Sequence, residues 1–436
     1  MFPIRKFPRG PRPTVLAPAS VKAGLGIAVA LVTAICPIAG YAGPFAHQRN
    51  MLPGARAAGM AGAFVAVADD PSAVYWNPAG YSLIERPELS VSGIGLIQSS
   101  TSFDQTISDE PFVEHAQSLT PGFFGASVRN GRFGFGYGFA SLDEHNVNQN
   151  DLFLGVELAS GDSVDYYRTY QEASTLSSAG IGLSYLVADG LSLGVSGAYY
   201  RRQSAVSNFQ IISEKSGAFT SRNLKYETLN EGLLGTAGVL FVWGHLRTGF
   251  SLRYPFPISN NTGVSDYQAD SPGSSGLPGS INHLSLLEGK SSEMDEPRVR
   301  TYQFGMAWGE PGHFLLAADL IKHAMGAAEE SRGLQTTYNF SVGMEAVFGW
   351  LTLRGGAFSN ASLYPAPKPG VANQQTAIDF NGNSVGIGYV QKSREISLTY
   401  VSQRGTGHAQ VVADSYATQQ VTASLQNLLL SSRVFF

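Results

Sequence analysis

Strict alternation of large apolar residues with small ones is the feature that most constrains how this chain can fold. It is clearest over residues 132–140, and the same period recurs at 178–187, 246–254, 302–308 and 338–348. In the first stretch the aromatic residues are Phe133, Phe135, Tyr137 and Phe139, and the residues between them are Gly134, Gly136, Gly138 and Ala140. Because successive side chains of a strand point to opposite faces, the pattern predicts strands with one large apolar face and one nearly bare face.

The composition of the bare face separates a membrane barrel from a soluble sandwich. A solvated face would carry Lys, Glu and Thr, whereas this one carries Gly, Ser and Ala, and only 14% of the chain is charged. After the N-terminus no long apolar run follows that could form a membrane helix. A chain that crosses lipid without such helices must do so as a closed sheet, since closure pairs every backbone group. The sequence therefore predicts an all-β fold, a transmembrane antiparallel β-barrel.

The first 42 residues read as a secretory signal peptide. Five basic residues precede the apolar stretch 23–38, which ends in the small-residue sequence Gly40-Tyr41-Ala42. We expect cleavage after Ala42, because the apolar stretch is too short to span about 20 residues of hydrocarbon comfortably. Cleavage would also remove Cys36, the single cysteine, and so exclude disulfide and thiol chemistry in the mature protein.

Charge and histidine spacing argue against several classes of function. Residues 1–42 hold five of the 29 basic residues and none of the 33 acidic ones, so cleavage takes the net charge from −4 to −9, which is unsuited to nucleic acid. The eight histidines show no metal-ligand spacing. The glycines of residues 134–138 recur at strand period rather than at a dinucleotide-binding turn. We therefore predict no metal, no cofactor and no enzymatic activity.

Short turns and long polar connections alternate along residues 87–436, and this alternation predicts about 14 strands. The short turns are expected at 130–131, 189–190, 243–244, 310–312, 349 and 392–393. The long loops are expected near 101–119, 142–174, 205–224, 255–297, 323–334, 360–377 and 403–417. A further turn at Asn381-Gly382 would change the count, so 12 or 16 strands stay open.

The last predicted strand carries Leu428, Leu430, Val434 and Phe436 on one face. A terminal aromatic residue on this face predicts delivery to the barrel-insertion machinery of a bacterial outer membrane. The phase of the pattern slips near residues 426–427, where we expect a β-bulge.

Residues 43–86 do not alternate and form a separate segment. They are dense in Gly and Ala and contain Asp69-Asp70 and Asn77-Pro78-Ala79. Such a segment predicts short helices in a tight space, with Asp70 or Ser72 capping one of them.

This segment gives the sequence a resemblance to one family. The Gly- and Ala-rich opening, Asp69-Asp70 and Asn77-Pro78-Ala79 resemble the hatch of FadL-type outer-membrane transporters of long-chain fatty acids and other hydrophobic compounds. The likeness continues through residues 120–131 and 194–202 and is strongest over 54–140. It implies a barrel plugged by an N-terminal hatch, ligand capture at the extracellular loops and lateral release at a kink in the third strand.

Three sets of residues are candidates for handling a ligand. The glycines of the third strand, Gly134, Gly136 and Gly138, would leave room for a ligand and bend easily. Apolar residues expected in loops would form a capture groove or pack loop on loop: Phe209, Ile212, Leu284 and Leu287. A cation would hold a ligand carboxylate. The resemblance points to Arg201, strict alternation turns Arg202 inward, and Lys322 is a further candidate.

Most basic residues on the inward phase are expected in ion pairs across the bore, with Asp319 and Glu345 as possible partners, and one of them is a candidate to hold a ligand carboxylate instead. They are Arg129, Arg202, Arg247, Arg253, Arg354 and Arg433.

The expected function is passive uptake of hydrophobic small molecules across the bacterial outer membrane, with lipid around the barrel. The Arg201-Arg202 pair favours fatty acids over aromatic hydrocarbons. One alternative is a structural or secretion-accessory barrel without a bore. Another is a barrel esterase or phospholipase, which would need a converging Ser, His and carboxylate.

Overall fold

The computed structural model describes residues 47–107, 110–157, 163–215, 217, 219–270, 284–285, 297–369, 374–409 and 418–436. The predicted signal peptide, residues 43–46 and Leu287 lie outside these residues. The side chains of Ile212 and Leu284 also lie outside the described part.

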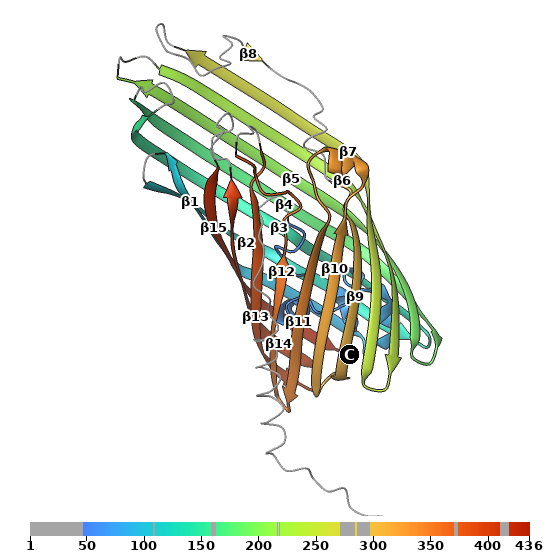
Figure 1. Ribbon diagram of the computed structural model, residues 1–436. Helices are drawn as coiled ribbons and strands as arrows, with labels where there is room; N and C mark the ends of the chain where they lie inside the picture. The colour runs from blue at the N-terminus through green and yellow to red at the C-terminus, as the bar shows by residue number, and fades with distance from the viewer. Residues whose placement is uncertain are drawn as a thin grey trace, which may run out of the picture. The chain divides into compact units, whose positions relative to one another are not determined.

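Fourteen antiparallel strands form a closed barrel (Figure 1). Each strand pairs with its neighbours along the chain, and β15 pairs back with β1. A two-residue strand, β8, adds to β7. The strands are β1 (Glu88–Ile107), β2 (Glu110–Asn130), β3 (Phe133–Glu157), β4 (Ser163–Ala188), β5 (Leu191–Glu214), β6 (Phe219–Trp243), β7 (Leu246–Asp270), β8 (Leu284–Ser285), β9 (Arg300–Glu310), β10 (Phe314–Ala324), β11 (Thr337–Phe348), β12 (Leu351–Asn360), β13 (Ala377–Gln391), β14 (Arg394–Ala409) and β15 (Gln419–Phe435).

The predicted strand number and short turns are confirmed. All six short turns lie within one residue of their predicted places. Asn381-Gly382 is not a turn, because both residues stay paired with β12 and β14. The two ends of the barrel meet at the short-turn end, where Glu88 pairs with Phe435.

The bulge expected near residues 426–427 is wrong. There β15 stays in register with β14, and the irregularity lies on the other neighbour, between Ile94 and Leu96 of β1. The apolar pattern of β15 changes phase because the buried Val421 and Ala423 face inward, whereas Leu428 and Leu430 face outward.

Several predicted loops are strands instead. β3 to β7 contain 24–26 residues each, whereas a tilted strand needs only about 9–11 residues to cross a membrane. Uncharged polar pairs, such as Thr169 with Asn150 at 2.9 Å, occupy the additional length. Polar residues of this kind are typical of loops, but here they form hydrogen bonds with each other across neighbouring strands. Phe209 and Ile212 consequently belong to β5. The predicted loop 323–334 begins with the last two residues of β10 and contains the short helix α3 (Ala327–Ser331).

The two faces of the sheet follow the predicted alternation. Large apolar side chains of the outward face are exposed, among them Phe135, Tyr137, Ile181, Leu183 and Val195. The inward residues between them are small or polar. Within the described residues, no helix is long and apolar enough to cross a membrane.

Residues 47–86, called here the N-terminal segment, lie against the inward face of the barrel (Figure 1). The segment contains α2 (Ala55–Gly59) and two 3-10 helices, η1 (Pro71–Val74) and η2 (Pro78–Leu83). Asp70 caps η1 by accepting from Ser72 N at 2.8 Å, and Asn77 caps η2 by accepting from Ala79 N at 3.1 Å. The expectation of short, capped helices is confirmed for the described part of this segment.

Candidate functional site

Inward glycines allow the N-terminal segment to approach the barrel wall closely. A Cβ placed on any of them would lie within about 3 Å of an atom of this segment, so only glycine fits. They come from eight strands, β3 to β7, β9, β11 and β12: Gly134, Gly136, Gly138, Gly182, Gly194, Gly238, Gly249, Gly305, Gly343 and Gly356. The bore at this depth is therefore filled by the segment.

The glycine row of β3 does not leave open space for a ligand, contrary to the sequence-based expectation. Tyr81, fully buried in η2, covers it. A Cβ on Gly136 would lie 2.3 Å from Tyr81 Cε1, and one on Gly134 would lie 2.3 Å from the Tyr81 carbonyl oxygen. The row of β3 also keeps an unbroken ladder with β2, where Gly136 pairs with Ser127. The strand does not open here.

Asn77-Pro78-Ala79 anchors η2 to β5 and β6. The Asn77 side-chain amide donates to Val65 O at 2.9 Å and to Val239 O at 3.1 Å. Ser192 Oγ donates to Ala79 O at 2.9 Å. A Cβ on Gly194 would meet Ala79 N at 2.2 Å. The triplet thus has a structural role that its residue types explain: a cap, a helix start and a small contact residue.

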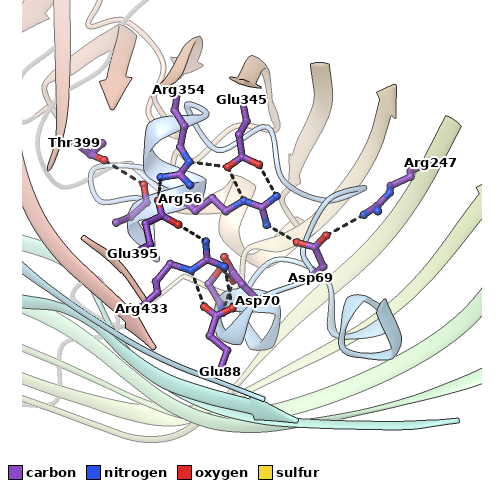
Figure 2. Close-up of polar contacts among 12 residues, drawn as sticks. Arg56, Asp69, Asp70, Glu88, Arg247, Glu345, Arg354, Glu395, Thr399 and Arg433 are labelled. Carbon is purple, nitrogen blue, oxygen red and sulfur yellow. Dashed lines mark hydrogen bonds and ion pairs between the residues drawn. The ribbon is translucent and has the colours of Figure 1, made fainter. Parts of the chain in front are cut away.

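A chain of buried ion pairs joins the N-terminal segment to the barrel near the short-turn end (Figure 2). Arg56 donates to both oxygens of Glu345, at 2.8 and 2.9 Å, and contacts Asp69. Asp69 also lies 3.0 Å from Arg247 of β7. The chain continues through Arg354, Glu395, Arg433 and Glu88, with N–O distances of 2.7–2.9 Å. The prediction of structural ion pairs is confirmed for Arg247, Arg354 and Arg433.

Arg56 and Asp69 stabilise each other's charged forms. Burial alone would lower the pKa of Arg56, but the carboxylates of Asp69 and Glu345 outweigh burial and raise this pKa well above its usual value. Burial alone would raise the pKa of Asp69, but Arg56 and Arg247 lower it. Both side chains therefore stay charged around neutral pH, which fixes α2 to the wall.

The remaining inward basic residues are held differently from the expectation. Arg253 contacts Tyr75 O and lies 3.7 Å from the Tyr75 ring centroid. Asp319 accepts from Phe64 N at 2.7 Å and Val65 N at 2.9 Å rather than from a basic residue. Arg129 is exposed beside a turn, where it donates to Gly131 O.

The three candidate cations do not converge on one site. Arg201 faces outward with a side chain 50% exposed, 3.8 Å from Glu231. Arg202 faces inward, 13% exposed, as strict alternation predicts, and lies 3.2 Å from Asp143. Lys322 lies on the outward phase of β10, because Asp319 and Ile321 are the buried residues, and its ammonium lies over the Tyr338 ring.

The backbone ladder between β2 and β3 is interrupted. Continuous backbone pairing runs from Asn130–Phe133 to Phe123–Ala140. Beyond it one further pair, Ala116–Val147, joins the two strands, so residues 117–122 and 141–146 are unpaired with each other. Each strand stays paired on its other side. We call this stretch the β2–β3 interruption. Pro121 contributes to it because proline has no N–H to donate, and a bulge in β3 lies between Ser141 and Asp143.

Side chains rather than backbone groups connect the two edges of the β2–β3 interruption. Ser141 Oγ donates to Pro121 O at 2.6 Å, and the Glu144 carboxylate lies close to the hydroxyls of Thr120 and Ser118. Side-chain hydrogen bonds can break by rotation of the side chain, whereas a backbone ladder cannot. This part of the wall is therefore held less firmly than the rest.

Asn50 links this edge of β3 to the opposite wall. Its side-chain amide donates to Asp143 Oδ1 at 2.9 Å, and Asn360 donates to its side-chain oxygen at 3.2 Å. Gln403 and Asn427 donate to its backbone oxygen at 3.1 and 3.2 Å. Sequence reasoning missed Asn50 and Asp143, and it placed Asp143 in a loop. The bulge that turns Asp143 inward is not visible in the local pattern.

An apolar groove of about 1180 Å³ lies on the outer face of β1 to β6. Residues of its lining include Val128, Tyr137, Ile181, Leu183, Val195 and Leu233. Among the described residues, no cluster of His, Cys, Asp or Glu has the geometry to hold a metal ion.

Comparison with known proteins identifies the family. A family model described as outer membrane protein transport protein (OMPP1/FadL/TodX) matches residues 34–252. The chain belongs to this family. As a member of the OMPP1/FadL/TodX family, it is an outer-membrane transport protein for hydrophobic compounds, so the resemblance in the N-terminal sequence is confirmed.

Solved structures share the fold at low sequence identity. A Pseudomonas aeruginosa FadL homologue has a TM-score of 0.55 at 13% identity, covering 91% of this chain and 99% of that chain. The Ralstonia pickettii toluene transporter TbuX has 0.55 at 14%, covering 89% and 99%. The P. putida toluene transporter TodX has 0.53 at 14%, covering 88% and 98%. No curated protein sequence matched the chain.

Proposed function

We propose that this protein takes up uncharged hydrophobic compounds by passive diffusion and releases them sideways through the β2–β3 interruption. The observation that carries the proposal is the interruption itself. Unpaired backbone in a lipid-facing wall is costly unless it borders a polar or water-filled space. Here residues 117–122 and 141–146 forgo their ladder beside a bore that the N-terminal segment fills.

The filled bore supports a lateral route over an axial one. We propose that the N-terminal segment, with residues 43–46, acts as a hatch, so that a compound entering from the extracellular end meets it before reaching the periplasm. The β2–β3 interruption then offers an exit in the side wall. The apolar groove on the outer face of β1 to β6 lies nearer the short-turn end, beside Val128, Phe135 and Tyr137, and would receive the compound after it leaves the wall.

The choice of substrate class follows from the cations. Long-chain fatty acids, the expectation from Arg201 and Arg202, need a cation that faces the bore and meets the ligand carboxylate. Arg201 and Lys322 face outward, and Arg202 already contacts Asp143. This geometry supports uncharged compounds such as aromatic hydrocarbons, with fatty acids as the alternative.

Export and assembly complete the proposal. We propose that residues 1–42 are removed as a signal peptide and that Phe436 guides insertion through the barrel-insertion machinery. Phe436 is exposed on the outer face, and its backbone N–H donates to Pro87 O at 3.0 Å. Phe436 lies where the last strand pairs with the first, so the insertion machinery would reach it before these two strands join.

The lateral route is tested by bridging the β2–β3 interruption. Cysteines replace Leu119 and Glu144, which lie on the two edges of the interruption at positions matched by the register of the pairs Ala116–Val147 and Phe123–Ala140. A reducible bifunctional maleimide that joins them should stop toluene uptake by cells, and reduction should restore it. The matched control joins cysteines at Phe124 and Phe139, which are partners in the intact ladder, and should leave uptake unchanged. Full uptake through the bridged Leu119–Glu144 variant would refute lateral release.

A further inference from the structure

Acidic side chains gather at one edge of the β2–β3 interruption. Asp143 and Glu144 belong to the unpaired stretch of β3, and Glu172 lies buried on the neighbouring β4. The facing stretch of β2, residues 117–122, carries no charged residue. Arg202 of β5 contacts Asp143 of this group. Among these side chains, three carboxylates accompany one guanidinium, and the His145 ring lies 3.9 Å from Glu172.

Asp143 already forms an ion pair with Arg202, the cation that a ligand carboxylate would need. Its Oδ2 lies 3.2 Å from Arg202, and its Oδ1 accepts from Asn50 at 2.9 Å. Asp143 is only 5% exposed, so both contacts are shielded from water. An anionic ligand would have to displace Asp143 from Arg202 and leave a carboxylate buried without its partner, which is unfavourable.

We propose that Asp143 is the specificity-determining residue of the lateral exit: it excludes anionic hydrophobic compounds and lets uncharged ones pass. The inference rests on the proposed lateral route and assigns its charge selectivity to one side chain. Repulsion adds to the occupied cation, because charges a few Å apart interact strongly where the effective dielectric constant is about 20 rather than that of water. An uncharged compound meets neither obstacle.

The chain supplies a matched control on the opposite face of the same strand. Arg201 is adjacent to Arg202 and forms an ion pair with Glu231, but this pair is exposed on the outside of the barrel. Glu231→Gln therefore removes a carboxylate from an Arg–carboxylate pair without changing the inward face. Asp143→Asn removes the corresponding charge inside and keeps a side chain of nearly the same shape.

The test compares hexadecanoic acid with its methyl ester, which have the same chain and differ in charge. Initial uptake at pH 7.5 is measured in cells expressing the protein, after subtraction of uptake by cells with empty vector. We expect the wild type to take up the ester and little acid. Asp143→Asn should raise acid uptake roughly tenfold, the effect of one contact with a charged group, and should change ester uptake by less than about twofold. Glu231→Gln should change neither.

Different outcomes identify which proposal fails. Ester uptake no higher than the vector background would overturn the proposed function itself. Ester uptake with equal acid uptake in the wild type would overturn the charge selectivity and leave the lateral route standing. The charge selectivity would also be overturned if the Asp143→Asn barrel is folded, as judged by heat-modifiable electrophoretic mobility, and takes up the acid at the wild-type rate. Hexadecylamine gives a readout without a variant: the wild type should take it up at least as well as the ester.

Discussion

Tyr81 and Gly136 illustrate how a single contact gives a strand its unusual composition. The bare inward row of β3 is visible in the sequence, but its occupant is a residue 55 positions earlier, and no local pattern connects the two. The alternation of β5 correctly turned Arg202 inward. It could not reveal the partner Asp143, because that carboxylate faces inward only through a bulge in β3.

We predict that Gly136→Ala loosens the N-terminal segment. The new methyl group would lie 2.3 Å from the Tyr81 ring, and overpacking of this kind commonly costs about 1–3 kcal/mol. The measurement is hydrogen exchange of η2, which should lose protection by a corresponding factor. Gly197→Ala is the control, because nothing lies within 4 Å of its added Cβ. Equal protection in the two variants would show that Tyr81 moves aside without cost.

We also predict that acid weakens the docking of the start of the segment through His47. Burial lowers the pKa of His47 to about 3, partly opposed by its hydrogen bond to Ile378 O. Below about pH 6.5 the undocked chain binds a proton that the docked chain does not. Docking should therefore lose about 2–3 kcal/mol between pH 6.5 and 4.5. His47→Gln keeps a donor and should flatten this dependence in hydrogen exchange corrected for intrinsic rates. The same loss in the variant would assign the effect to another group.

At the scale of elements, the ion-pair chain of Figure 2 connects α2 of the N-terminal segment to β1, β7, β11, β12, β14 and β15. Its charges balance only as a set, so one substitution leaves a buried charge uncompensated. The sequence predicted Arg247, Arg354 and Arg433 from their inward phase, together with Glu345, but it missed Arg56. It did not reveal the order of the chain, which depends on the closure of β15 on β1.

We predict that Glu345→Gln releases α2. Glu345 receives hydrogen bonds from Arg56 and Arg354, and removing one partner of a buried pair typically costs about 3–5 kcal/mol. Limited proteolysis should then cut within residues 47–70 in the folded barrel. Glu310→Gln removes an exposed carboxylate beside His245 and should leave this region resistant, since exposed pairs contribute little. Resistance of the Glu345 variant would mean that packing alone holds α2.

At the scale of the whole barrel, β1 to β7 are long and β9 to β14 are short, with 10–16 residues each. The sequence predicted the number of strands and the short turns, because both depend on local period and turn residues. It did not predict the length of β3 to β7, because the outer parts of these strands have the polar composition of loops although their backbones are paired. Beyond the β2–β3 interruption, β2 and β3 share the single pair Ala116–Val147, and β3 continues to pair with β4.

Finally, we predict that deleting residues 47–86, with residues 1–46 retained, yields a barrel that still inserts but conducts ions. Every strand pair lies outside the deleted segment, so the ladder is intact. The deletion removes Arg56 and Asp69 together, one charge of each sign. Arg247, Arg354 and Arg433 remain in balance with Glu88, Glu345 and Glu395. The inward glycines would then border an open bore, because their neighbours in the wild type are atoms of the deleted segment.

Single-channel recordings in planar bilayers should show a large, stable conductance that the full-length protein lacks. Gly197→Ala in the full-length protein should stay closed, as a check that substitution in the wall does not itself cause leakage. A deletion variant that inserts and remains closed would mean that the wall collapses inward without the segment, and the proposal that the segment is the hatch would be withdrawn.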